Sequence, residues 1–331
     1  MLKREGRVAA AAAALCVIYL HAQQPSTIRI PVRLVSVPTL VVSQDGKYIP
    51  GLSAKDFRVT DNDRPQTIQA DVDVLPISLV VALQANQEVR EYSEFIERTG
   101  ALLEDSIAGA TGQAALITYN DGVTVAKPFE HGDFRDALRA VPLSGDKANA
   151  IDAGIRAIEL LKERPSSFSR VLLFIGQPVD SAGGTKLETL EADAERENVQ
   201  IYALTLPILA KTFVSESFTL EGLGSQWYKG GYIASIKLTK AVPALRRAAS
   251  AGTHADLFSL LTAETGGIQL HFRQQKQLEN AIIGLGDALR SRYFLSYRPD
   301  RHDAGFHTIA VRVDVPGAIV YARPGYKVAA E

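Results

Sequence analysis

The chain has 331 residues, of which 46% are hydrophobic and 22% are charged, and its formal net charge is −1. These values exclude a wholly disordered chain, a collagen-like repeat and a polytopic membrane protein, and they leave ample material for a buried core. The near-neutral charge also makes nucleic acid an unexpected partner.

The N-terminus has the layout of a secretory signal peptide. Basic residues precede an apolar stretch over residues 8–20, and the small Ala22 is followed by a polar Gln-Gln-Pro. The stretch is shorter than the roughly 20 residues that a membrane-spanning helix needs. We expect residues 1–22 to be cleaved and the protein to be exported, either periplasmic or secreted. A retained N-terminal membrane anchor is the alternative. Cleavage would remove Cys16, the one cysteine of the sequence, so no disulfide or thiolate metal site is expected.

Both flanks of the chain have the pattern of short strands. Residues 23–75 contain short β-rich runs separated by Asp, Asn and Gly clusters at 44–46 and 61–63. Residues 293–331 include a strict apolar alternation over 309–315. We expect the two flanks to pack together as a small antiparallel β region.

Residues 76–292 alternate buried strands with amphipathic helices. Continuous apolar runs typical of strands buried on both faces occur at 77–83, 114–118, 171–175 and 201–206. Apolar residues spaced three and four apart predict helices over 89–103, 151–161, 187–194, 257–261 and 278–289. This alternation predicts an α/β domain in which helices sandwich a central, mostly parallel sheet, with the working loops at the carboxyl ends of the strands.

An insertion over residues 207–252 interrupts this alternation. A connection of this length is often functional. Trp227 and Tyr228 lie in it and would suit anchors for a protein partner. The alternatives are a surface excursion without a role, and rings that pack back onto the core.

No catalytic or cofactor-binding signature is present in the sequence. A Gly-x-Ser-x-Gly elbow, a His-Glu-x-x-His motif and a phosphate-binding loop are all missing. Gly284 and Gly286 fall inside a helical pattern, which argues against a dinucleotide site. His302 and His307 flank a probable turn, where we expect solvated side chains rather than metal ligands, and Asp61 is assigned to a turn. We therefore expect no enzyme, no cofactor and no bound metal.

The order of these elements resembles a von Willebrand factor type A (VWA) domain, which implies a Rossmann-like fold. The matching segments are 76–81 for the first strand, 112–120 for the second, 148–153 for the central helix, 170–175 for the fourth strand and Glu264-Thr265-Gly266-Gly267 for a late turn. The flanks resemble the exported bacterial VWFA-related family, of the acidobacterial type. That likeness rests on Gly51-Leu52-x-x-x-Asp56-Phe57, Arg290-Ser291-x-Tyr293-x-Leu295-x-Tyr297 and Arg323-Pro324-Gly325-Tyr326.

The chain departs from this family at the cation site. VWA domains commonly hold a divalent cation through Asp-x-Ser-x-Ser, a Thr and a later Asp. The corresponding positions here are Ala82, Gln84 and Asn86, then Ala148, then Gln177. Because Mg²⁺ and Ca²⁺ rely on anionic oxygen ligands, the resemblance implies a degenerate metal-ion-dependent adhesion site without a cation.

Two roles for the three amides remain open at this stage. They could hydrogen-bond one another and brace the loops, or they could meet polar groups of a partner. The predicted function is a non-catalytic, exported protein–protein interaction module that binds a protein of the cell envelope independently of cations. A structural scaffold without a binding site at these loops and an envelope hydrolase are the alternatives.

Overall fold

A computed structural model of the chain describes residues 34–44, 47–71, 75–206, 225–228, 231–234, 256–271, 275–299 and 303–328. Every described residue lies in one compact unit, Leu34–Glu331. The expected signal peptide, residues 1–22, falls outside the described residues. No helix in the described part of the chain has the length and apolarity required to span a membrane.

An eight-stranded sheet forms the centre of the α/β part. Its strands are β5 (Ile77–Gln84), β6 (Gln113–Tyr119), β7 (Val123–Lys127), β8 (Ser169–Gly176), β9 (Gln200–Thr205), β10 (Ser225–Tyr228), β11 (Gly231–Ala234) and β12 (Gln269–His271). They lie in the order β10-β11-β12-β9-β8-β5-β6-β7. The strands from β12 to β6 are parallel, whereas β7 and the β10–β11 hairpin are antiparallel to their neighbours. The prediction of a mostly parallel central sheet is confirmed.

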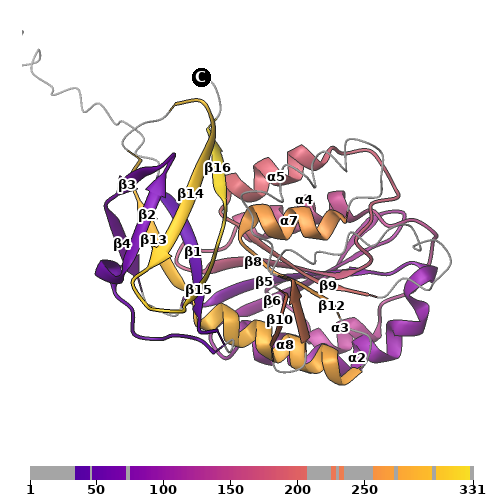
Figure 1. The fold of residues 1–331 in the computed structure, drawn as a ribbon. Helices are drawn as coiled ribbons and strands as arrows, with labels where there is room; N and C mark the ends of the chain where they lie inside the picture. The colour runs from indigo at the N-terminus through magenta and orange to yellow at the C-terminus, as the bar shows by residue number, and fades with distance from the viewer. Residues whose placement is uncertain are drawn as a thin grey trace, which may run out of the picture. The chain divides into compact units, whose positions relative to one another are not determined.

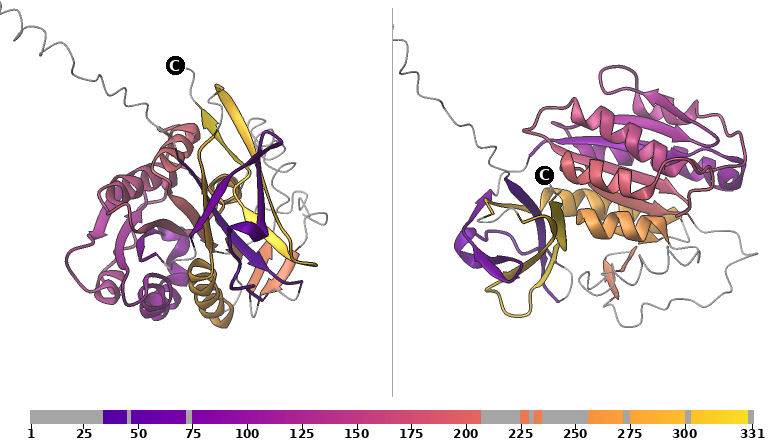
Figure 2. Two further views of the ribbon diagram at one scale, coloured as in Figure 1. Left: turned by 90° about the vertical axis from the view of Figure 1, so that its left-hand side faces the viewer. Right: turned by 90° about the horizontal axis from the view of Figure 1, so that it is seen from above.

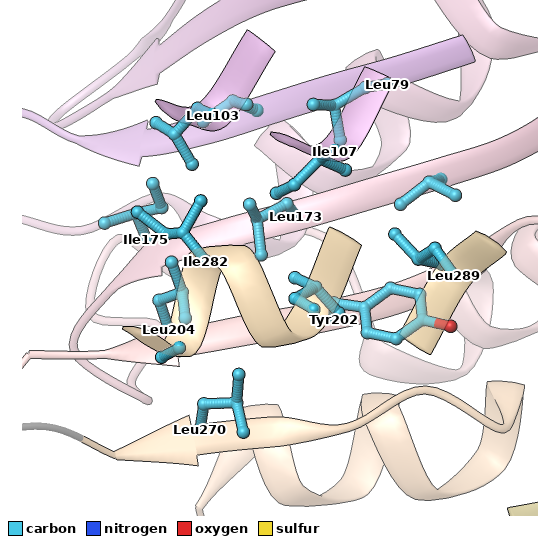
Figure 3. Close-up of a cluster of buried hydrophobic side chains, with 14 of the residues drawn as sticks. Leu79, Leu103, Ile107, Leu173, Ile175, Tyr202, Leu204, Leu270, Ile282 and Leu289 are labelled. Atoms are coloured by element: carbon cyan, nitrogen blue, oxygen red, sulfur yellow. The ribbon is translucent and has the colours of Figure 1, made fainter. Parts of the chain in front are cut away.

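Helices cover both faces of this sheet (Figures 1 and 2). One face carries α4 (Ala150–Lys162), α5 (Leu187–Arg196) and α7 (Leu257–Thr265), and the other carries α2 (Ser93–Leu102), α3 (Phe134–Arg139) and α8 (Gln275–Arg290). Successive residues of β5 alternate between the two cores. Val80 and Ala82 pack on the α4 side, while Leu79 and Val81 pack on the α8 side, where Leu79 and Ile282 belong to one cluster (Figure 3).

The two flanks build two four-stranded antiparallel sheets. Their strands are β1 (Val35–Val42), β2 (Phe57–Asp61), β3 (Arg64–Gln66), β4 (Ile68–Asp71), β13 (Tyr293–Tyr297), β14 (Gly305–Val313), β15 (Ile319–Ala322) and β16 (Gly325–Val328). One sheet has the order β15-β1-β13-β4 and the other β16-β14-β2-β3. Val37, Phe57 and Leu295 contribute to the hydrophobic cluster that the sheets share. Strands from both ends of the chain therefore pair within each sheet, as we expected.

The helix predicted over residues 89–103 differs from the structure. The segment begins as a 3₁₀ helix, η2 (Gln87–Tyr92), continues as α2 and ends as a π-helical turn, η3 (Leu103–Ala108). In the widened turn the Gly109 N–H donates to the Glu104 carbonyl at 3.0 Å. The Ser106 carbonyl instead accepts a hydrogen bond from the Arg290 guanidinium of α8. The π-helical turn is thus in contact with α8 through this bond.

Candidate functional site

The carboxyl ends of β5 and β8 bring three of the five predicted site residues together. Gln84 is the last residue of β5, Asn86 follows two positions later, and Gln177 comes directly after β8. Because β5 and β8 are adjacent and parallel, their ends meet at one edge of the sheet.

The three amides form a hydrogen-bonded cluster, which we call the amide cluster (Gln84, Asn86 and Gln177). The backbone N–H of Gln177 donates to Gln84 Oε1 at 2.6 Å. Gln84 Nε2 in turn donates to Asn86 Oδ1 at 2.9 Å and to Gln177 Oε1 at 3.4 Å. Since the Gln177 N–H can only donate, it fixes the orientation of the Gln84 amide, and Gln84 Nε2 then fixes that of Asn86.

The other two predicted positions contribute no polar side chain. Ala82 is fully buried and lies between Ile117 of β6 and Phe174 of β8 in the register of the sheet. Ala148 acts through its backbone. Its N–H donates to Ser181 Oγ at 2.8 Å, and its carbonyl accepts from the Ser181 N–H at 2.9 Å. These bonds connect the loop before α4 to the loop after β8.

All five positions are shielded from solvent. Gln84 and Asn86 have 0% of their surface exposed, and Gln177 has 6%. The segment after β5 is joined to the loop before α4, because the Ser144 N–H donates to the Ala85 carbonyl and the Gln87 N–H donates to the Gly145 carbonyl, both at 3.0 Å. The amide cluster therefore lies beneath the loops and does not form their outer surface.

Nearby carboxylates are engaged by the backbone. Asp180 Oδ1 accepts from the Ile151 N–H at 3.0 Å and so caps the first turn of α4. Asp121 Oδ1 accepts from the Lys147 N–H at 3.0 Å. Within the described ranges no group of three or more His, Cys, Asp or Glu side chains could hold a metal ion. The amide oxygens are neutral and already accept hydrogen bonds, so this donor set does not fit a hard divalent cation.

Two donor groups at this edge have no hydrogen-bond partner among the described residues. They are Asn86 Nδ2 and the Tyr119 hydroxyl at the end of β6, and both are buried. Burial raises the pKa of Tyr119 far above its usual value, and the charge of Asp180 raises it further. Space here is tight, since a Cβ on Gly176 would lie 2.4 Å from the Tyr119 hydroxyl oxygen. Sequence reasoning did not single out Tyr119.

A second polar group, also missed from the sequence, joins the last residue of β9, the first residue of β12 and the residue before α7. Gln269 Nε2 donates to Thr205 Oγ1 at 2.9 Å and to Asp256 Oδ2 at 2.9 Å. Asp256 caps α7 by accepting from the Ser259 N–H. Its place before an apolar helix is the signal that could have found it. The Leu257 N–H donates to the Pro178 carbonyl at 3.1 Å, which joins this group to the segment after Gln177.

The predicted partner-binding pair lies in a strand of the central sheet. Trp227 and Tyr228 belong to β10, and the Trp227 backbone pairs with that of Tyr232 in β11. The structure describes only the backbone of these two residues. Within 207–252 it describes 225–228 and 231–234, and the other positions lie outside the described residues.

The expectation of a solvated His307 was wrong. His307 is 4% exposed, and its Nδ1 lies 2.8 Å from Oδ1 of Asp61, which is 5% exposed. The turn pattern around Asp61 suggested capping, but the side chain points into the terminal strands, where it meets a histidine 246 residues away in sequence. His302 is outside the described residues.

No family model and no curated protein matches this chain. Several solved structures are similar to it at low identity. An aerotolerance-related membrane protein from Bacteroides fragilis is 14% identical, with a TM-score of 0.40, and the match covers 64% of this chain and 98% of that one. BatB from Bacteroides thetaiotaomicron gives the same four values. The SpRpn10 VWA domain is 15% identical with a TM-score of 0.32, covering 40% of this chain and 77% of that one. The fold class itself rests on the strand order and helix layers described above.

Proposed function

We propose that this chain is an exported, non-catalytic VWA-like module that binds a protein of the cell envelope without a divalent cation. The observation that carries the proposal is the amide cluster. Gln84, Asn86 and Gln177 bring no negative charge to the positions where related domains commonly bind a cation, and their oxygens are engaged with one another. Neutral amides whose oxygens already accept hydrogen bonds are poor competitors for a hydrated Mg²⁺ ion.

The binding face would be the outer surface of the loops above the amide cluster. Glu88, Asp121, Lys147 and Lys186 are exposed on these loops and carry both signs of charge. The hydrogen bonds beneath hold the loops in one arrangement, which reduces the entropy lost on binding. In this proposal the cluster braces the loops and the exposed side chains meet the partner.

Site-specific crosslinking tests the binding face. A photo-reactive residue at Lys147 or Lys186 should capture a protein in the native envelope. The control position is Arg139 of α3, which is exposed on the face of the sheet that α2, α3 and α8 cover. A photo-reactive residue there should capture no protein. Capture should survive chelation by EDTA. Equal capture at Arg139, or loss of capture with EDTA, would contradict the proposal.

Calorimetry tests cation independence separately. Titration of the purified protein with Mn²⁺ or Mg²⁺ should release no heat of binding. Micromolar binding that Gln177→Ala or Gln84→Ala abolishes would show that the amide cluster holds a cation after all.

A structural scaffold is the second candidate, and the burial of all five positions favours it. A scaffold needs the amide cluster for folding and needs no partner at the loops. It predicts no specific capture at Lys147 or Lys186, together with a loss of stability in Gln84→Ala.

The two aromatic residues of β10 remain proposed anchors. Replacing Trp227 and Tyr228 together by Ala should reduce recovery of the partner captured through Lys147, because aromatic side chains supply much of the binding energy at interfaces. Unchanged recovery would place these rings outside the interface.

Export and the lack of catalysis also belong to this proposal. Basic residues, an apolar stretch and Ala22 support cleavage after residue 22, and mass spectrometry of the protein from culture would detect the shortened chain. For catalysis, the buried His307 has both ring nitrogens engaged, one by Asp61 and one by the Asp303 carbonyl, so it is not available to activate a nucleophile.

A further inference from the structure

A buried ion pair joins β2 to β14 in the terminal strands. His307 Nδ1 lies 2.8 Å from Asp61 Oδ1. The other carboxylate oxygen, Oδ2, accepts from the Tyr297 hydroxyl at 2.9 Å and from the Tyr326 hydroxyl at 2.7 Å. Three side chains from three other strands therefore converge on one carboxylate. Strands β2, β13, β14 and β16 thus meet at Asp61.

The second ring nitrogen of His307 also faces an acceptor. Nε2 lies 2.7 Å from the backbone carbonyl oxygen of Asp303. A carbonyl oxygen and a carboxylate oxygen can only accept, so each contact requires a proton on the nitrogen. A neutral imidazole carries one N–H, and its bare nitrogen would then face an oxygen lone pair at under about 3 Å. The geometry therefore describes an imidazolium ion.

We propose that His307 is a proton-dependent latch, which fastens β14 to Asp61 and to the Asp303 carbonyl and releases one of these contacts when the ring loses a proton. This inference goes beyond the proposed binding function and does not depend on it. It concerns the terminal strands, whereas the proposed binding face belongs to the central sheet.

The contact with the Asp303 carbonyl is the one that should be released. A single remaining proton is held more strongly by the ionised Asp61 than by a neutral carbonyl, because charged acceptors form the stronger hydrogen bonds. Asp303 precedes the first residue of β14, Gly305, by two positions. Loss of the proton should therefore loosen the start of β14 first and leave the bond to β2 in place.

The charged and titratable groups around the ring come from several elements. They are the Asp61 and Asp303 carboxylates, the Tyr297 and Tyr326 hydroxyls, Arg64 opposite Asp61 in β3, and Arg323, whose guanidinium lies 5.8 Å from the Tyr326 ring centre. Burial lowers the pKa of His307, but the bonds to the Asp303 carbonyl and to Asp61 outweigh it and raise the pKa above 6.5.

The sign of the pH effect follows from this direction. A histidine that binds its proton more tightly in the folded state stabilises that state fully below about pH 6.5, the value for the unfolded chain. The stabilisation disappears as the pH rises through the higher pKa of the folded state. The latch is therefore closed in mild acid and opens toward alkaline pH.

Nitrogen NMR of the imidazole tests the latch without altering the chain. At pH 6 both ring nitrogens of His307 should carry protons, and the ring should titrate at a pH above 6.5. Hydrogen exchange, corrected for its intrinsic pH dependence, should accelerate at the start of β14 as the ring titrates, but not in β8. A ring that titrates below pH 6.5 would overturn the proposal.

A pair of variants provides the second test. The melting temperature of the wild-type chain should fall between about pH 6 and about pH 9, and His307→Gln should remove most of that slope because its side chain does not titrate. His131→Gln, a matched change at an exposed histidine, should retain the slope. If His307→Gln keeps the wild-type slope, another group is responsible and the latch is refuted. If that variant does not fold, the NMR titration decides.

Discussion

The amide cluster at the edge of the central sheet and the His307–Asp61 pair in the terminal strands are both buried polar groups. They offset the free-energy cost of removing polar atoms from water in different ways. The amide cluster carries no charge, and hydrogen bonds among Gln84, Asn86 and Gln177 engage its three oxygens, although Asn86 Nδ2 has no partner among the described residues. The terminal pair keeps two opposite charges and surrounds the carboxylate with hydroxyl donors.

This difference determines how each region should respond to change. A neutral cluster loses hydrogen bonds when one member is removed, but it leaves no isolated charge, and its stability does not depend on pH. A charged pair that loses one member leaves the other charge buried alone, which costs far more. Substitutions in the two regions should therefore differ in size and in pH dependence.

The largest effect is expected for Asp61→Ala. This change leaves the His307 imidazolium and two tyrosine hydroxyls without their shared acceptor, so the free energy of unfolding should fall by about 3–5 kcal/mol. Urea denaturation measures the loss. Asp61→Asn, which keeps an acceptor for the hydroxyls, should give a smaller loss and serves if the first variant does not fold.

A matched carboxylate provides the control for this prediction. Asp314 pairs with Arg58 at 2.8 Å, but both side chains are more than half exposed. Asp314→Ala should change stability by no more than about 1 kcal/mol. Comparable losses in Asp61→Ala and Asp314→Ala would mean that burial of the first pair has no energetic consequence.

An intermediate effect is expected for Gln84→Ala. It leaves the buried Gln177 N–H and Asn86 Oδ1 without partners and should cost about 2–3 kcal/mol, with the same loss at pH 6 and at pH 8. Gln87→Ala is the control, since the Gln87 side chain also bonds to a carbonyl, that of Leu143, but is exposed. A pH-dependent loss in Gln84→Ala would indicate an ionised group within the cluster.

The smallest effect is expected for Tyr119→Phe, which should stabilise the protein rather than destabilise it. Its buried hydroxyl has no hydrogen-bond partner among the described residues, so removing it should raise the free energy of unfolding by up to about 1 kcal/mol. Tyr202→Phe should lower it by a similar amount, because the equally buried Tyr202 hydroxyl donates to Gln200. Destabilisation by Tyr119→Phe would show that an internal water or another group satisfies the hydroxyl.

Most of the fold could be predicted because its signals are local. Apolar runs such as 171–175 and the helical spacing over 278–289 each report on their own element, and the structure has β8 and α8 there. The helix predicted over 89–103 was only partly right, because the segment up to Tyr92 is a 3₁₀ helix and only Ser93–Leu102 is α-helical.

The site could be predicted in position but not in exposure or partnership. The predicted ends of two parallel strands place Gln84 and Gln177 at one edge of the sheet. The sequence around these residues does not indicate that loops cover them. Asp61 and His307 show the same limit more clearly, because no spacing rule connects residues 246 positions apart. Tyr119 was missed since an aromatic residue at the end of an apolar strand looks like ordinary core.

The strand order of the terminal sheets has a consequence for how the chain reaches its native state. β1 forms its ladders with β13 and β15, which belong to the last part of the sequence. While the ribosome still holds that part, β1 has neither of these neighbours, and both of its edges are open to wrong pairing. Formation of these sheets is then a late step that joins distant parts of the sequence. A chain truncated before Tyr293 would leave β1 as an unpaired edge strand, which is prone to aggregation and to proteolysis.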